Sequence, residues 1–107
     1  MEINRTVREE IANITNQLIK KYAPQKIILF GSAASGELSE DSDIDFLIIK
    51  DSVPKYGIDR MRELDRLIET QMPVDMLVYK PGEFEERLRL GDPFIKMILN
   101  EGKVLYG

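Results

Sequence analysis

The chain has 107 residues, 43% of them hydrophobic, and a formal net charge of −4, which suits a single domain spanning residues 1–107. Its acidic balance, without a basic cluster, excludes a large nucleic-acid footprint and a template-reading role. The absence of cysteine and histidine excludes disulfides, thiolate or imidazole metal ligands and histidine-based catalysis. The sequence has no apolar run of roughly 18–20 residues and no visible signal peptide, so we expect a cytoplasmic, non-membrane protein.

The first expected element is an amphipathic helix that ends before Pro24. Thr6 and Glu9 have the spacing of a capping box, and Asn4 is an equally good alternative cap. The apolar positions recur every three or four residues, which is the helical period: Ile3, Val7, Ile11, Ile14, Leu18 and Tyr22. A strand over about Lys26–Phe30 follows.

The next segment, residues 36–42, is polar and acidic and is expected to be a loop. A second strand is expected over about Ile44–Lys50. Because this strand is apolar on both faces after its first residues, it should lie in the middle of a sheet. Residues 51–57 form the next loop, a candidate flap that carries two lysines and Tyr56.

The second half of the chain continues the alternation of helices and strands. We expect a helix from Ile58 to Met72 that Pro73 ends, and a strand over about Val74–Tyr79. The remaining elements are expected in this order: a turn at Pro81-Gly82, a helix over Glu83–Arg89, a helix that begins after Asp92 and ends at Gly102, and an edge strand over Val104–Tyr106. The charged helix faces should be solvated. The expected fold is therefore α/β, a small mixed β-sheet with helices packed on it.

Three aspartates stand at the starts of two expected strands. Asp43 and Asp45 alternate along one strand, so both side chains point to one face with Cα atoms roughly 6.5–7 Å apart. Asp75 lies near the start of another apolar run. Adjacent carboxylates repel unless a cation lies between them, and Mg²⁺ or Mn²⁺ prefers carboxylate oxygen. Such a set suits a two-metal phosphoryl-transfer or nucleotidyl-transfer site, although a solvated strand edge and a simple connector are the alternatives.

The turn after the first strand has the residues of a phosphate-binding turn. Gly31 permits unusual backbone angles, and Ser32 offers a hydroxyl. If a helix starts here, its free N–H groups would hold a phosphate. The alternative is a plain turn without a ligand.

These residues together resemble the polymerase-beta-type nucleotidyltransferase superfamily, over nearly the whole chain. The motif is Gly31-Ser32, then Asp43-Ile44-Asp45, then a later Asp75. The short length resembles the superfamily's minimal branch, the MNT domains. The resemblance implies a metal-dependent enzyme that transfers a nucleoside monophosphate, with ATP the expected donor, to a hydroxyl. It implies two ions held by the three aspartates, with Asp75 also accepting the hydroxyl proton, and β- and γ-phosphates held by Gly31 and Ser32.

The chain departs from the family pattern in the turn. MNT domains commonly carry arginines in a Gly-Ser-Arg-Ala-Arg-Gly form, whereas this chain has Ala33 and Ser35 at those places. An arginine there would neutralise triphosphate charge through bidentate hydrogen bonds. Without one, this task falls to the metal ions, the backbone and either Lys50 or Lys55, and we expect Ala33→Arg to tighten ATP binding.

The resemblance also implies a partner. Stand-alone MNT domains are similar to antitoxins that adenylylate a tyrosine of a HEPN ribonuclease toxin. A first alternative is a binding module that neutralises a HEPN partner by contact, for which the missing arginines speak. A second alternative is transfer to a small hydroxylated molecule such as an aminoglycoside. The sequence leaves homo-oligomerisation open.

Overall fold

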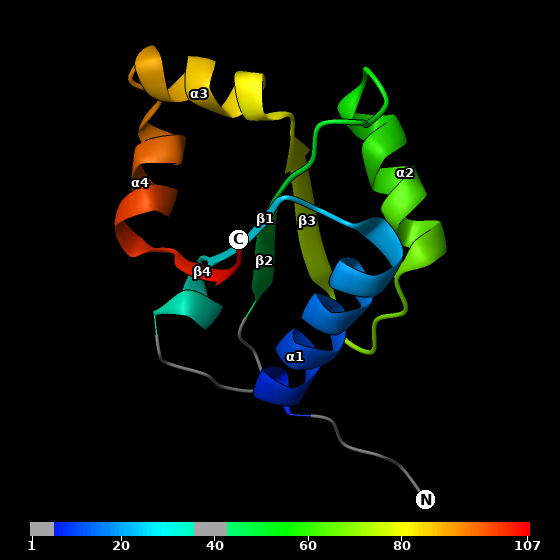
Figure 1. Cartoon of the computed structure of the whole chain (residues 1–107). Coiled ribbons are helices and arrows are strands. Elements are labelled where there is room, and N and C mark those ends of the chain that lie inside the picture. Colours follow the sequence, from blue (N-terminus) through cyan, green and yellow to red (C-terminus); the bar gives the residue numbers. More distant parts are fainter. Residues whose placement is uncertain (1–5, 36–42) are drawn as a thin grey trace, which may run out of the picture.

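The structure, a computed structural model, describes residues 6–35 and 43–107 (Figure 1). The predicted loop over residues 36–42 lies outside them. The elements follow in this order: helix α1 (Val7–Gln17), π-helical turn η1 (Leu18–Tyr22), β1 (Lys26–Phe30), 3₁₀ turn η2 (Ser32–Ala34), β2 (Ile44–Ile49), α2 (Gly57–Leu67), β3 (Val74–Tyr79), α3 (Pro81–Arg89), α4 (Pro93–Glu101) and β4 (Lys103–Tyr106).

The four strands form one mixed sheet in the order β3-β2-β1-β4. Strand β1 is antiparallel to both β2 and β4, whereas β2 and β3 are parallel. The expected mixed α/β fold is confirmed, as are the central place of β2 and the edge place of β4. The parallel pairing brings the amino ends of β2 and β3 to the same end of the sheet.

Helices cover both faces of the sheet, with α1 and α2 on one side and α3 and α4 on the other (Figure 1). Side chains alternate along β2 accordingly. Phe46 and Ile48 are buried in the core under α1 and α2, whereas Leu47 and Ile49 are buried in the core under α3 and α4. This two-sided burial explains why β2 is almost continuously apolar after Asp45.

The helix starts follow the expected capping chemistry in two places. Thr6 and Glu9 form a capping box at the start of α1, in which the Glu9 N–H donates to Thr6 Oγ1 over 3.1 Å. Asp92 caps α4 by accepting a 2.9 Å hydrogen bond from the Phe94 N–H, and Gly102 is the residue at its carboxyl end. The third helix differs from the prediction: Pro81 and Gly82 are not a separate turn but the first residues of α3, a position that suits proline because its missing N–H would have no partner there.

Helix α2 ends at Leu67, five residues before the predicted end at Met72. The backbone turns extended at Ile68, and side chains of α1 then hold the following segment. Gln17 Nε2 donates to the Glu69 carbonyl over 2.7 Å, and the Glu69 N–H donates back to Gln17 Oε1 over 2.8 Å. These bonds across the molecule satisfy backbone groups that a longer helix would have satisfied internally.

None of the helices described in residues 6–35 and 43–107 is long and apolar enough to cross a membrane.

Candidate functional site

Asp45 and Asp75 stand directly opposite each other on neighbouring strands. They are register partners in the parallel pairing of β2 and β3, so their side chains project from the same face of the sheet. Phe30, on β1, is the register partner of Asp45 on its other side. Each aspartate is the second residue of its strand, so the pair lies at the end of the sheet where β2 and β3 begin. Asp75 is exposed there and Asp45 is half-buried.

Asp43 immediately precedes β2 and is joined to the turn after β1. Its N–H donates a 3.2 Å hydrogen bond to Ser32 Oγ, and the Ser32 hydroxyl is 3.4 Å from the Asp43 carbonyl oxygen, to which it donates. The structure therefore brings Ser32 and the aspartate segment together. Ser32 has a structural role here that sequence reasoning did not foresee, because it fixes the entry into β2.

Gly31 lies against the carboxylate of Asp45. Its φ of +76° favours glycine, and a Cβ at this position would lie only 2.3 Å from Asp45 Oδ2. The glycine thus lets the backbone of the turn approach the carboxylate. The segment after it, where the sequence left a helix start open, is only the three-residue 3₁₀ turn η2, which is too short to present the dipole of an α-helix.

The electrostatics of the group are those of crowded like charges. The pKa of Asp45 is raised above its ordinary value of 3.8, first by desolvation and then by the negative charges of Asp75 and Asp43. A hydrogen bond that Asp45 shares with Asp75 contributes in the same direction. Because a nearby cation would relieve this repulsion, the cluster has the charge and the oxygen donors that suit a hard divalent ion.

Among the residues that the structure describes, two carboxylates, and not three, lie directly together in the site. Within residues 6–35 and 43–107, no three acidic side chains converge to form a ready-made metal cluster. Asp45 and Asp75 are the two that lie directly opposite each other, and Asp43 is their exposed neighbour. The assignment of all three aspartates as metal ligands remains a prediction.

Neither lysine considered for charge neutralisation lies at the aspartates. Lys50 follows the far end of β2, roughly 16 Å along the strand from Asp45. Its Nζ donates to the Tyr22 carbonyl and lies 4.6 Å from the centroid of the Tyr22 ring. Lys55 lies at the same far end, in the pocket between α2 and α3. The expectation that either lysine compensates for the missing arginines is therefore wrong.

The two positions that carry arginine in the family pattern differ in exposure. Ala33 is 3% exposed and packs in the core under α1 and α2, whereas Ser35 is exposed. A large cation at position 33 would have to enter this core, so Ala33→Arg is the wrong test of the turn. Ser35 is the position where an arginine could reach a ligand.

Sequence reasoning also missed two buried charges, since the charged helix faces were expected to be solvated. Glu10 is fully buried, and its carboxylate accepts hydrogen bonds from the backbone N–H groups of Gln71 and Met72. Arg60 is 4% exposed and pairs with Glu83 over 2.7 Å. Glu10 lies one helical turn before buried Ile14, and Arg60 lies one turn before buried Leu64. This spacing places both charged residues on the buried faces of their helices, and it could have predicted their burial.

Comparisons with known proteins identify the family of the chain. A family model described as a nucleotidyltransferase domain matches residues 8–106. A Methanocaldococcus jannaschii protein named "Putative protein adenylyltransferase MJ0604" is 37% identical over 98 residues, which cover 90% of this chain and 94% of the relative. A second protein of that organism, "Putative protein adenylyltransferase MJ1305", is 33% identical over 85 residues, covering 75% of this chain but only 56% of the relative.

A solved structure supports the fold. The crystal structure of a nucleotidyltransferase candidate from Sulfolobus solfataricus superposes with a TM-score of 0.54 at 24% identity, over 80% of this chain and 84% of that one. The sheet, the paired aspartates of β2 and β3 and the family match over nearly the whole chain lead to one conclusion. The chain belongs to the nucleotidyltransferase domain family and is a nucleotidyltransferase.

Proposed function

We propose that this nucleotidyltransferase transfers AMP from ATP to a tyrosine hydroxyl of a protein partner, and that the partner is a HEPN ribonuclease toxin. The protein acceptor is supported by the relative that is 37% identical over 94% of its own length and is named as a protein adenylyltransferase. The HEPN partner is supported by the resemblance of the chain to MNT domains.

The observation that carries the proposal is the opposition of Asp45 and Asp75 beside Gly31. The donors are all oxygen, and the pKa of Asp45 is raised by desolvation and by its carboxylate neighbours, so these residues fit Mg²⁺ or Mn²⁺. Asp45 and Asp75 would hold the metal, with Asp43 completing a site for two ions. The metal, when bound, supplies charge neutralisation of the triphosphate and activation of the attacking oxygen.

The residues of the chain divide the remaining work. The tyrosine oxygen forms a bond to the α-phosphorus, the bond from that phosphorus to the bridging oxygen breaks, and pyrophosphate leaves. Asp75 is the more exposed carboxylate of the pair and accepts the hydroxyl proton. The backbone of Gly31 can hold the β- and γ-phosphates, and the Ser32 hydroxyl can do so by exchanging its long 3.4 Å hydrogen bond to the Asp43 carbonyl for one to a phosphate oxygen.

The test is an intact-mass measurement on a HEPN-domain protein encoded next to the gene for this chain. Incubation with this protein, ATP and Mg²⁺ should add the mass of one or more AMP units to a partner tyrosine. The modified partner should remain inactive as a ribonuclease after this protein is removed, because a phosphodiester persists without the enzyme. Asp75→Asn should still bind the partner and fail to modify it.

The second candidate is a binding module, and the exposed Ser35 favours it because no arginine assists triphosphate binding in the described turn. A pure binder would leave the mass of the partner unchanged, and ribonuclease activity would return on separation. AMP transfer to aminoglycosides but to no protein would instead point to a small-molecule acceptor. Each outcome therefore selects a different candidate.

A further inference from the structure

A pocket of about 290 Å³ opens between the start of α2, the edge strand β3 and helix α3. Ligand pockets usually run from about 300 to 1,000 Å³. The pocket therefore suits one side chain or a short peptide segment better than a whole nucleoside triphosphate. It lies at the end of β3 opposite the one where Asp75 stands.

The wall of the pocket combines apolar surface with positive charge. Met61 and Leu77 supply apolar surface, and the lining residues include three cations against one anion. The anion, Glu83, is occupied by buried Arg60, which also donates a 3.0 Å hydrogen bond to the Val78 carbonyl. In a chain whose net charge is −4, this pocket is a local positive region.

The two remaining cations are Lys55 and Arg87. Lys55 is exposed and lies 5.5 Å from the centroid of the Tyr56 ring. Arg87 is 60% exposed and makes a 3.5 Å ion pair with Asp92, which contributes little in water. Both cations can therefore meet a carboxylate that approaches from solvent.

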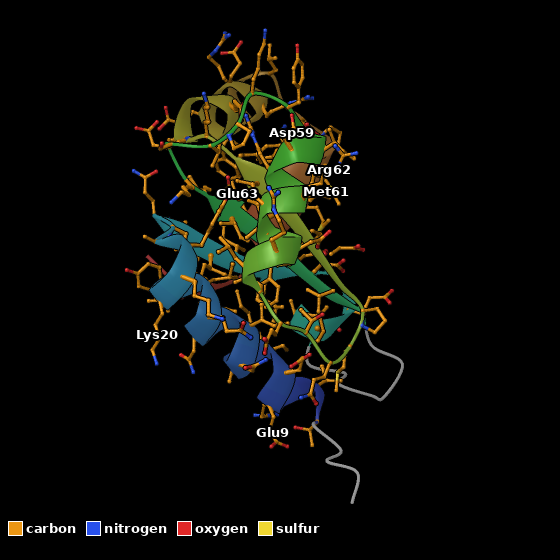
Figure 2. The ribbon with its side chains drawn as sticks, turned by 90° about the vertical axis from the view of Figure 1, so that its right-hand side faces the viewer. Glu9, Lys20, Asp59, Met61, Arg62 and Glu63 are labelled. Atoms are coloured by element: carbon orange, nitrogen blue, oxygen red, sulfur yellow. The ribbon has the colours of Figure 1, made fainter. Side chains whose placement is uncertain are left out.

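Apolar residues beside the pocket are left uncovered. Tyr56 is 61% exposed, Ile58 58% and Met61 42%, although the last two belong to the apolar pattern of α2. Figure 2 looks onto α2 and labels Met61 next to Arg62 on this helix. Large apolar side chains that gather beside a pocket are typical of a surface that receives another protein.

One lining residue of the pocket lies close to the transfer site along β3. Leu77, which lines the pocket, lies two residues beyond Asp75 and projects from the same face of the strand. Their Cα atoms are roughly 6.5–7 Å apart at the usual rise per residue. A peptide segment with one side chain in the pocket would therefore reach Asp75 within about four residues.

We propose that this pocket is the docking subsite for the acceptor protein: it takes an apolar side chain of the acceptor and pairs Lys55 and Arg87 with an acidic side chain beside it. Both side chains lie within about four residues of the hydroxyl that receives the nucleotide. The inference rests on the proposed function and specifies how the acceptor is recognised.

The test uses tyrosine decapeptides as acceptors, with ATP and Mg²⁺ and AMP incorporation as the readout. Single positions up to four residues from the tyrosine are changed from leucine to serine or from glutamate to lysine. Leucine and glutamate should each be preferred at one position. Met61→Glu should raise the acceptor KM by about tenfold or more, the usual effect of losing one apolar contact, with kcat and the KM for ATP unchanged.

Two further variants make the test specific. Lys55→Glu should reverse the charge preference, so that the lysine peptides become better acceptors than the glutamate peptides. Leu99→Glu is the matched control, since Leu99 is 47% exposed on α4, away from the pocket, and it should leave the peptide preference unchanged. If Met61→Glu were simply less stable, its raised KM would be uninformative. The reversed charge preference of Lys55→Glu would still test the subsite, because a reversed preference requires a folded enzyme.

The outcomes separate this inference from the proposed function. Transfer that ignores the neighbours of the tyrosine, and that Met61→Glu and Lys55→Glu leave unaltered, would overturn the docking subsite while adenylylation stands. Absence of AMP transfer to every peptide and to the HEPN protein would overturn the proposed function and the subsite together.

Discussion

Gly31 lies so close to Asp45 that a Cβ on this glycine would clash with the carboxylate, at 2.3 Å from Asp45 Oδ2. The contact joins the turn after β1 to the first residues of β2. It means that the two motifs of this family form one structural unit, in which the conformation of the turn determines where the carboxylate can lie.

Gly31→Ala should therefore damage both the fold and the site. The φ of +76° alone should cost about 1–3 kcal/mol of unfolding free energy, and the Cβ would displace the carboxylate. We expect a lower midpoint in urea and weaker Mn²⁺ binding by calorimetry. Gly57→Ala is the control, because no atom lies within 4 Å of its added Cβ, and it should change stability by less than about 0.5 kcal/mol. Unchanged Mn²⁺ affinity in Gly31→Ala would refute the link.

Asp45→Asn should stabilise the metal-free protein at neutral pH. The folded-state pKa of Asp45 is raised, so the folded protein binds this proton more tightly than the unfolded chain does. The ionised form therefore costs stability, and the cost appears as the pH rises from the ordinary pKa of 3.8 through the folded value. Urea unfolding of both proteins from pH 3 to pH 8 measures this difference, which should vanish at the acidic end. A variant less stable at pH 7 would contradict the repulsion.

Glu10→Gln should destabilise the protein without any direct contact with the site. The fully buried carboxylate accepts from two backbone N–H groups, with Met72 N at 3.0 Å, and from the Asn13 amide, also at 3.0 Å. A glutamine would turn an N–H donor toward these donors and leave one unsatisfied, which costs about 1–3 kcal/mol. Glu86→Gln is the matched control: Glu86 pairs with Arg89 at the surface, where such a pair contributes at most about 1 kcal/mol. Equal losses in the two variants, measured in urea, would count against this role.

Ser35→Arg should tighten ATP binding. Ser35 is exposed at the end of the turn, so an arginine there can form charge-assisted hydrogen bonds with phosphate. A gain of about 1.5 kcal/mol would appear as roughly tenfold tighter binding by calorimetry with Mg²⁺ present. Ala33→Arg should instead lower the melting temperature, since Ala33 is buried in the core under α1 and α2. If Ser35→Arg folds normally and binds ATP no better, the exposed side of the turn does not face the phosphates.

The strands and the opposition of the aspartates were accessible from local patterns. Short apolar runs predicted β1 and β3 with their observed bounds, and β2 to within one residue. Asp45 and Asp75 stand at the same place in two similar apolar runs, so parallel pairing puts them side by side. The sequence predicted that the aspartates stand near the starts of two strands, and the parallel register of these strands is what the structure adds.

The features that could not be predicted depend on contacts between distant residues. Helix α2 ends early because Gln17 bonds to the backbone of Glu69, 52 positions away. The burial of Ala33 depends on a core whose other members come from distant parts of the chain, such as Ile14 and Leu64. The separation of Lys55 from the aspartates depends on the direction in which β2 runs, because a loop that follows a strand lies at its far end. Periodicity describes one element at a time and contains none of these relationships.

The crowding of Asp45 by Asp75 has an evolutionary consequence. Repulsion between the two ionised carboxylates lowers the stability of the metal-free protein. Selection for folding alone would therefore tend to replace one of them with a neutral residue. A related protein that only bound its partner would tolerate that replacement, and its folded state would become more stable. The presence of both acids in this chain therefore favours a protein that uses the pair for chemistry, and we expect a relative that only binds its partner to lack one of them.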